Sequence, residues 1–222
     1  MPDHGGLPLG IFGGMFDPVH FGHLRAAFEL REALGLERVH FVPAADPPHR
    51  EPPLADGGRR LDMLRAAISG EPGFVADDRE LRRSGTSYTV STLEDFRCQY
   101  GSRPLVLLVG LDAFLGLASW HRWRELLALA HIAVTRRPGA GLPESGELSE
   151  LLAERREQDP ARIAATPAGR VFIHAGTQLD IASSEVRRVL QAGRDPRYLM
   201  PDAVRRMILD AGTYSRPGET KE

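Results

Sequence analysis

Short apolar segments alternate with helical patterns along most of this chain of 222 residues, and no other feature limits its fold as strongly. Segments with the length and composition of buried β-strands are residues 9–12, 39–42, 74–76, 105–109, 131–135 and 171–174. Helical patterns between them cover residues 24–34, 59–68, 89–99 and 113–129. Because strands that alternate with helices form a parallel sheet covered on both faces, we predict an α/β protein with a doubly wound parallel sheet.

The regions between these elements carry weaker signals. Residues 43–58 are rich in Pro and Asp and indicate a loop, whereas residues 138–169 are polar with many Gly and Pro and contain one predicted helix, over residues 144–157. The chain length suits one substantial domain, so we expect residues 1–215 to form it, with the C-terminal helices packed on the sheet. We expect residues 216–222 to be a disordered tail.

Composition argues against several classes of protein. The formal net charge is −2, so nothing favours nucleic acid or an acidic membrane surface as a partner. No apolar run approaches the roughly 18 residues of a membrane span, and residues 1–8 lack the pattern of a secretory signal. Cys98 is the only cysteine, which excludes an intramolecular disulfide and favours the cytoplasm.

Lysine is nearly absent, because Lys221 in the tail is the only one. The rest of the chain therefore cannot supply a Schiff base, a pyridoxal cofactor site or a Walker phosphate loop. Arginine does not act as a proton-transfer base at neutral pH, but it binds phosphates and carboxylates well. Electrostatic positioning by arginine, histidine and the backbone remains.

A glycine turn with two histidines follows the first predicted strand. Residues 13–23 are Gly-Gly-Met-Phe-Asp-Pro-Val-His-Phe-Gly-His, and a helical pattern begins directly afterwards. Glycines let the backbone approach a ligand, and a helix start presents N–H groups and a positive dipole end to an anion. His20 and His23 are three residues apart, so their rings share one helix face. We infer stabilisation of phosphate charge during phosphoryl or nucleotidyl transfer; simple helix capping is the alternative.

Ligands in doubly wound folds bind beyond the carboxyl ends of the strands. Glycine or charged residues follow three predicted strands there: Gly13-Gly14, Gly110-Leu111-Asp112 and Arg136-Arg137. A later segment, Ile-Ala-Ser-Ser-Glu-Val-Arg at residues 181–187, has Ser183 or Ser184 as a candidate N-cap and Arg187 one turn further on. This segment is either an ordinary helix start or a second phosphate site.

The His-x-Gly-His segment and its flanking Gly-Gly-x-Phe-Asp-Pro resemble the signature of the nucleotidyltransferase superfamily, and residues 181–187 are similar to its second signature. Further segments resemble bacterial nicotinate-mononucleotide adenylyltransferases, so that the likeness extends from about residue 9 to residue 214. These segments are residues 47–50, 87–93, 110–113 with Trp120, 136–139, and 200–204 through Tyr214. The resemblance implies a Rossmann-like nucleotidyltransferase fold with a small helical C-terminal part. It also implies AMP transfer from ATP to nicotinate mononucleotide, with release of pyrophosphate, in NAD biosynthesis.

The resemblance implies roles for individual residues as well. His20 and His23 would be catalytic and contact the ATP phosphates, with His20 nearest the α-phosphate. The residues that would bind the rest of ATP are Gly13, Gly14, Phe16, Gly110, Asp112, Ser183, Ser184 and Arg187. Those that would bind the acceptor are His49, Arg50, Tyr88, Thr89, Trp120 and Arg137. Mg²⁺ would be carried mainly by the ATP phosphates.

Within the acceptor set, Trp120 would stack on the pyridine ring, Thr89 would meet the nicotinate carboxylate, and Arg137 would hold the mononucleotide phosphate. The sequence departs from the family pattern at Met15, where Thr or Ser is usual, and at Ala182, Ser184 and His121. Other functions stay open: adenylyl transfer to nicotinamide mononucleotide, phosphopantetheine or a flavin, a non-catalytic nucleotide sensor, or a structural or interaction module. A homo-oligomer is also left open.

Overall fold

A parallel β-sheet forms the centre of the protein. The computed structural model describes residues 6–46, 52–136, 141–177 and 179–215, and within them seven strands pair in the order β3-β2-β1-β4-β5-β7-β6. Every pair is parallel, which confirms the predicted α/β fold. The strands are β1 (Leu9–Gly14), β2 (Arg38–Pro43), β3 (Phe74–Ala76), β4 (Leu105–Gly110), β5 (His131–Arg136), β6 (Arg156–Glu157) and β7 (Val171–Ala175).

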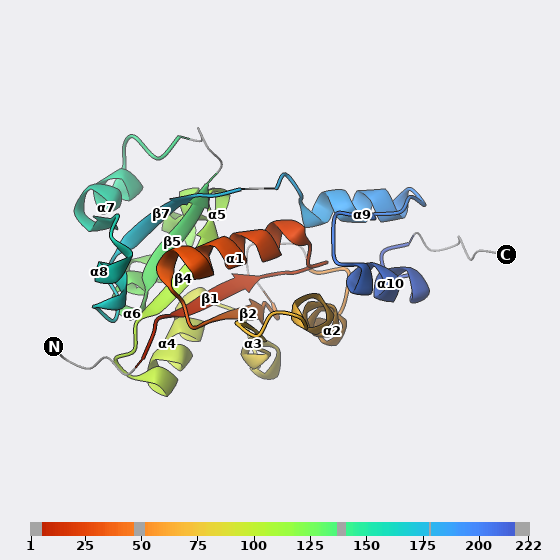
Figure 1. Ribbon diagram of the computed structural model, residues 1–222, viewed down its shortest axis with the longest axis horizontal. Helices are drawn as coiled ribbons and strands as arrows, with labels where there is room; N and C mark the ends of the chain where they lie inside the picture. The colour runs from red at the N-terminus through yellow and green to blue at the C-terminus, as the bar shows by residue number, and fades with distance from the viewer. Residues whose placement is uncertain (1–5, 47–51, 137–140, 178, 216–222) are drawn as a thin grey trace.

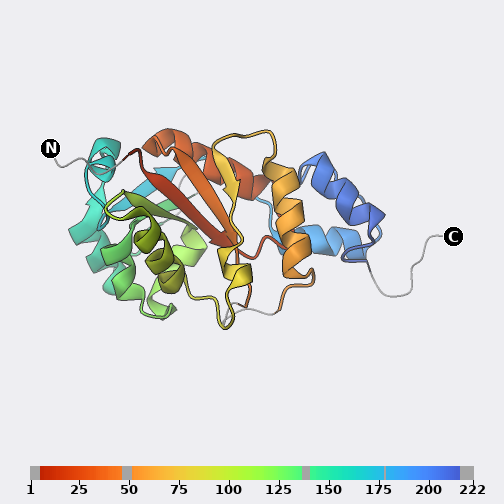
Figure 2. The same cartoon turned by 90° about the horizontal axis from the view of Figure 1, so that it is seen from below.

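Helices cover both faces of this sheet, as Figures 1 and 2 show. Those on one face are α1 (Phe21–Leu34), α2 (Gly57–Ile68) and α8 (Pro160–Ala164), and the core on this face also includes side chains of α9 (Ser183–Gln191) and α10 (Asp202–Asp210). Those on the other are α4 (Thr89–Tyr100), α5 (Leu111–Leu115), α6 (Leu126–Leu129) and α7 (Glu147–Arg155). The fold is therefore doubly wound.

Strand β4 shows why the sheet is buried on both sides. Val106 and Leu108 belong to the core under α1, whereas Leu105, Leu107 and Val109 belong to the core under α4. Successive side chains of a strand point to opposite faces, so a strand covered by helices on both faces is apolar at every position. This continuous apolar run makes β4 easy to predict.

The helix predicted over residues 113–129 is wrong as one element. It is divided into α5, two 3₁₀ turns and α6, and the turns are Leu117–Ser119 and Trp123–Glu125. Gly116 ends α5, and Arg122 has a φ of +52°, in the left-handed region that interrupts a right-handed helix. The interruption leaves Trp120 between the two 3₁₀ turns, with extended backbone.

Other differences involve short elements. The helix predicted over residues 144–157 covers only Glu147–Arg155, because Arg156 and Glu157 pair with β7 as the edge strand β6. Helices α3 (Arg79–Arg82) and α8 were not predicted, since four or five residues show no periodicity. The predicted loop is correct for residues 44–46 and 52–56, but α2 begins at Gly57. Residues 216–222 lie outside the described part of the chain.

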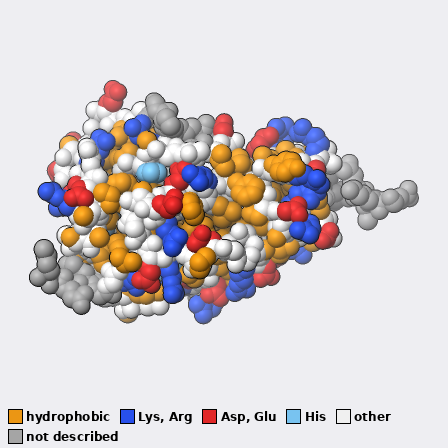
Figure 3. Space-filling view, in the orientation of Figure 1, with side chains coloured by type: hydrophobic (Ala, Val, Ile, Leu, Met, Phe, Trp, Pro, Cys, Tyr) orange, Lys and Arg blue, Asp and Glu red, His pale blue; other side chains and the backbone are white. Residues whose placement is uncertain are grey.

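Helices α9 and α10 lie beyond the carboxyl ends of the strands, at one end of the molecule (Figure 1). Their buried side chains, among them Val186 and Val204, join the same core as α1 and α2. Acidic and basic side chains are interspersed on the face shown in Figure 3, rather than gathered by sign. None of the described helices combines the length and apolar composition that a membrane crossing requires.

Candidate active site

A cleft of about 1210 Å³ opens where β1 and β4 end. The segments that border it come from both halves of the sequence: the turn after β1, the first turn of α1, the start of α5 and the start of α9. Residues of the predicted ATP site that line the cleft are Gly13, Gly14, Phe16, His20, His23, Gly110, Asp112, Ser183, Ser184 and Arg187. The fold therefore gathers this whole set in one place.

His20 and His23 stack on each other at the floor of the cleft. Their ring centroids are 3.7 Å apart, with an interplanar angle of 26°. His20 is the N-cap of α1, and its backbone N–H donates to Nδ1 of His23 at 3.3 Å. In the neutral form of His23, Nε2 therefore carries the hydrogen. Nδ1 of His20 has no hydrogen-bond partner among the described residues, although His20 is only 4% exposed.

Both rings favour the neutral form. Burial lowers the pKa of His20 to about 4. Burial, followed by the proximity of His20, lowers the pKa of His23 well below its usual 6.5. The pair at neutral pH is thus a set of uncharged N–H donors, which suits an anionic ligand without repulsion between two imidazolium ions.

The low pKa of His20 has a consequence for stability. In the unfolded chain His20 binds a proton near pH 6.5, whereas in the folded chain it does so only near pH 4. The free energy of unfolding therefore has its full value above pH 6.5, where His20 is neutral in both states. The free energy of unfolding should fall by about 3 kcal/mol as the pH decreases from 6.5 to 4. Unfolding measured across this range should show a shallower slope for His20→Gln than for the unsubstituted protein. Parallel curves for the two proteins would contradict the assignment.

Gly22, inside the histidine motif, allows this packing. A Cβ at this position would lie 2.9 Å from Nδ1 of His20 and 3.3 Å from the carbonyl oxygen of Ile181. Any larger residue would push the His20 ring away from α1 or displace the segment before α9. The glycine is thus required by the close approach of an imidazole, in addition to any contact with a ligand.

Phe16 packs against the ring of His23. Its ring is 1% exposed and meets the ring of His23 edge-on, with centroids 5.0 Å apart. Phe12 and Phe41 complete the aromatic cluster around it. Phe16 therefore contributes mainly by fixing the orientation of His23.

Asp17 holds the turn between β1 and α1 in place. Its carboxylate is 3% exposed and accepts from the N–H groups of Leu54 and Ala55, at 2.9 and 3.1 Å. The Tyr214 hydroxyl donates to it at 2.6 Å, and Arg187 donates to its backbone carbonyl at 2.6 Å. Because these partners occupy the carboxylate, Asp17 is a structural anchor and not a free base.

Arg60 was missed by sequence reasoning. Its guanidinium, on a residue 1% exposed, donates to the carbonyl oxygens of Ala55, Met15 and Ala44 at 3.1, 2.7 and 2.8 Å. It thus joins the turn after β1 to the loop after β2 and to the start of α2. Arg60 follows Arg59 within a helical pattern, and nothing in the sequence distinguishes its role.

The start of α9 differs from the prediction. The N-cap is Ala182, so Ser183 and Ser184 are the first two residues of the helix, and neither is the cap. The Ser183 hydroxyl instead donates to the carbonyl oxygen of Pro18 at 3.0 Å, which fixes α9 beside the start of α1. Both helices direct their N-termini at the cleft, where N–H groups and the dipole favour an anion.

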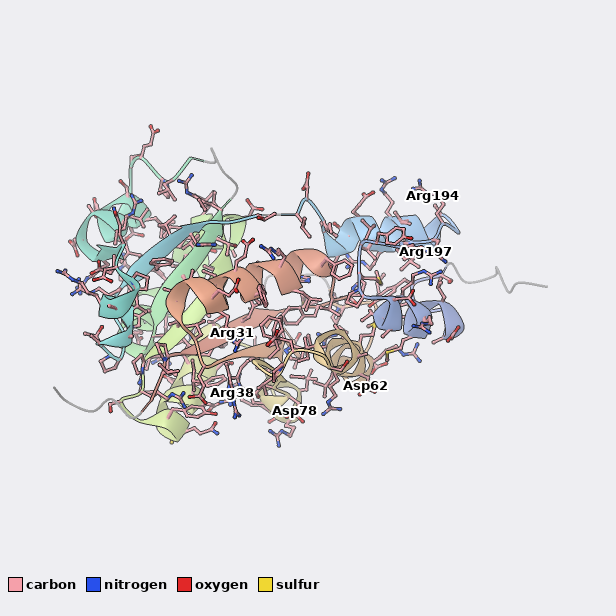
Figure 4. The ribbon with its side chains drawn as sticks, in the orientation of Figure 1. Arg31, Arg38, Asp62, Asp78, Arg194 and Arg197 are labelled. Carbon is pink, nitrogen blue, oxygen red and sulfur yellow. The ribbon has the colours of Figure 1, made fainter. Side chains whose placement is uncertain are left out.

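Two further predictions concern arginine and aspartate. Arg187 lines the cleft, whereas Arg194 and Arg197, labelled in Figure 4, lie past the end of α9 and do not. Asp112 is exposed and is the second residue of α5, whose N-cap is Gly110. Asp112 therefore leaves its carboxylate available at the cleft wall.

A smaller cavity of about 170 Å³ adjoins the cleft, and the residues that line both are Gly13, Gly14, Met15, Leu108, Val109 and Trp120. Tyr88 and Thr89, at the start of α4, line this cavity together with Trp120, so the structure brings these three predicted acceptor residues together. The Tyr88 ring lies against His121, with centroids 4.2 Å apart. His49, Arg50 and Arg137 lie outside the described residues.

Comparison with known proteins gives a consistent result. Residues 11–189 match the family model described as cytidylyltransferase-like. A Methylococcus capsulatus protein named "Probable nicotinate-nucleotide adenylyltransferase" is 49% identical over 209 residues, covering 94% of this chain and 100% of that protein. A protein of the same name from Halorhodospira halophila is 44% identical over 211 residues, covering 94% and 96%.

A solved structure is also similar. The Plasmodium falciparum nicotinic acid mononucleotide adenylyltransferase complexed with NaAD superposes with a TM-score of 0.72 at 16% identity. The match covers 94% of this chain and 98% of the other. At this identity, the structural similarity shows that the two proteins share a fold.

Proposed function

Because the chain belongs to the cytidylyltransferase-like family, and within it to the nicotinate-nucleotide adenylyltransferases, we propose that it transfers AMP from ATP to nicotinate mononucleotide. The products are nicotinate adenine dinucleotide and pyrophosphate, so the enzyme acts in NAD biosynthesis. The observation that carries the proposal is the stacked pair of His20 and His23, at a cleft that receives two helix N-termini and continues into a second cavity.

The chemistry needs no covalent enzyme intermediate, since the acceptor already carries a nucleophile. A phosphate oxygen of nicotinate mononucleotide forms a bond to the α-phosphorus of ATP. The bond from that phosphorus to the α,β-bridging oxygen breaks, and pyrophosphate leaves with the electron pair. His20 and His23 would donate N–H groups to the developing charge, and Arg187 would add a fixed positive charge.

Magnesium fits this site as an ion carried by the substrate. Among the described residues, no three His, Cys, Asp or Glu side chains are grouped as a metal site, and Asp17 is occupied by its own partners. Mg²⁺ prefers phosphate and water oxygens around one or two carboxylates, and Asp112 is the carboxylate at the cleft wall. When bound, the ion would neutralise triphosphate charge.

The acceptor would occupy the smaller cavity. Trp120 borders it and offers a ring face to a pyridine, and the first turn of α4 offers N–H groups to a carboxylate beside Thr89. A cytoplasmic location suits these two substrates. This assignment places ATP and the mononucleotide on either side of the turn at Gly13-Gly14.

Trp120→Ala should weaken acceptor binding selectively. Loss of a stacking partner costs on the order of 1–3 kcal/mol, so KM for nicotinate mononucleotide should rise roughly tenfold while KM for ATP changes little. Steady-state kinetics with each substrate varied in turn would measure both constants. Trp123→Ala is the matched control, because Trp123 lines neither cavity. Equal losses for both substrates would contradict the stacking role.

Pyrophosphate release tests the function itself. The protein is incubated with ATP and Mg²⁺ and with one acceptor at a time: nicotinate mononucleotide, nicotinamide mononucleotide or phosphopantetheine. Release with nicotinate mononucleotide, with the dinucleotide product identified by mass, is the expected result. Release only with another acceptor would keep the chemistry and overturn the assignment of the smaller cavity. ATP binding without any turnover would favour the nucleotide sensor.

A further inference from the structure

A buried carboxyl group lies in the wall of the smaller cavity and has no part in the mechanism described above. It belongs to Glu80 in α3, a residue that is 6% exposed and that lines the cavity with Ser87, Tyr88, Thr89 and Thr92. A buried acid needs hydrogen-bond donors to offset the loss of hydration. The residues that supply these donors indicate the structural role of Glu80.

Two hydroxyl groups supply them, from opposite ends of the turn that begins α4. The Thr92 hydroxyl, in the first turn of the helix, donates to Oε1 of Glu80 at 2.5 Å. The Ser87 hydroxyl hydrogen-bonds the same carboxyl group from the residue before the N-cap, Tyr88. Residues 87–92 are therefore held at both ends by one side chain.

The contacts extend outward from both hydroxyls. The Ser87 Oγ accepts from the N–H groups of Ala45 and Asp46, at 3.1 and 3.3 Å, in the loop after β2. Thr92 Oγ1 accepts from Arg83 at 3.2 Å. Glu80 thus connects the start of α4 to β2 and to α3, which fixes the turn relative to the sheet.

Opposing effects act on the pKa of Glu80. Burial raises the pKa of its carboxyl group, while hydrogen bonds from Thr92 and Ser87 and the nearby Arg83 oppose the shift. The two hydroxyl contacts tie Glu80 to both ends of the turn at residues 87–92, so Glu80 would act on a ligand in the cavity through that turn.

We propose that Glu80 is a positioning residue that holds the turn at residues 87–89 from both sides, and that this clamp sets the preference for a carboxylate over an amide on the acceptor ring. The inference rests on the proposed function. Carboxylate and amide have nearly the same shape, so discrimination between them depends on donors held rigidly in place. The first-turn N–H groups of α4 are donors of this kind.

Steady-state kinetics of Glu80→Gln, with ATP, nicotinate mononucleotide and nicotinamide mononucleotide, tests the clamp. A hydrogen bond to a charged group corresponds to roughly tenfold in binding, so KM for nicotinate mononucleotide should rise about tenfold. KM for ATP and kcat should each change by less than about threefold. The ratio of kcat/KM for the acid over the amide should fall, which a general loss of stability would not cause.

Thr92→Val and Ser87→Ala remove one hydroxyl each, with little change in shape. Like Glu80→Gln, each should raise KM for the acid and lower the ratio of kcat/KM for the acid over the amide. They keep the test decisive if Glu80→Gln does not fold. Glu94→Gln is the control, because Glu94 lies on the same helix α4, pairs with Arg122 at an exposed position and is not among the partners of Glu80. It should leave both constants unchanged.

Two failures are distinguishable. If the unsubstituted protein does not adenylylate nicotinate mononucleotide, the proposed function is wrong and this inference falls with it. If it does, but the variants raise both KM values equally or leave the acid-to-amide ratio unchanged, the clamp alone is refuted.

Discussion

His20→Ala is expected to lower kcat by about a hundredfold or more, while the affinity for ATP changes by only a few-fold. The ring lies in the cleft beside His23 at the start of α1, where it can donate to the α-phosphate as charge develops. Removing one preorganised donor from such a site typically costs 10²–10³ in kcat. The other contacts proposed for the triphosphate would remain, since Arg187 and the two helix N-termini are unchanged.

Steady-state turnover together with calorimetric ATP binding separates these two quantities. His174→Ala is the control, because His174 lies at the end of β7 and does not line the cleft. Turnover within a factor of about three of the unsubstituted protein would remove His20 from the mechanism. Loss of ATP affinity equal to the loss of kcat would instead assign it to ground-state binding.

Arg60→Met is expected to reduce the free energy of unfolding by about 3–5 kcal/mol. Methionine fills similar space but donates no hydrogen bond, so the carbonyl groups of Met15, Ala44 and Ala55 would lose their buried partner. Each unsatisfied buried group costs about 1–3 kcal/mol. Because Met15 belongs to the turn after β1 that lines the cleft, catalytic efficiency should also fall.

Chemical denaturation measures the change, with Arg65→Met as the control. Arg65 lies on the same helix and forms an exposed ion pair with Asp62, so its loss should alter stability by no more than about 0.5 kcal/mol. A change below about 1 kcal/mol in Arg60→Met would show that water replaces the guanidinium at these carbonyls.

The sequence predicts the sheet well, because its central strands are buried on both faces and are therefore continuously apolar. It fails for residues 113–129, where the pattern is helical but Gly116 and the left-handed Arg122 divide the segment. It also fails for β6, since two residues at a sheet edge carry no periodic signal.

Site residues divide in the same way. His20 and His23 are predictable, because both belong to one local segment whose spacing fixes their relation. Glu80 and Arg60 are not, because their roles depend on partners brought near by the tertiary fold. The motif contains Asp17, but it does not predict the hydrogen bond that Asp17 accepts from Tyr214, 197 positions away.

The shared wall of the two cavities, at Gly13, Gly14, Met15 and Trp120, has a further effect on the reaction cycle. In the proposed arrangement, each substrate would occupy one cavity and could leave independently. The product joins the two halves through a diphosphate, so it would bind both subsites at once. While one half stays bound, the other half would remain at a high effective concentration near its own subsite. The geometry that would align the two reactants would thus also bind the dinucleotide product at two subsites, and we expect its dissociation to be a slow step of turnover.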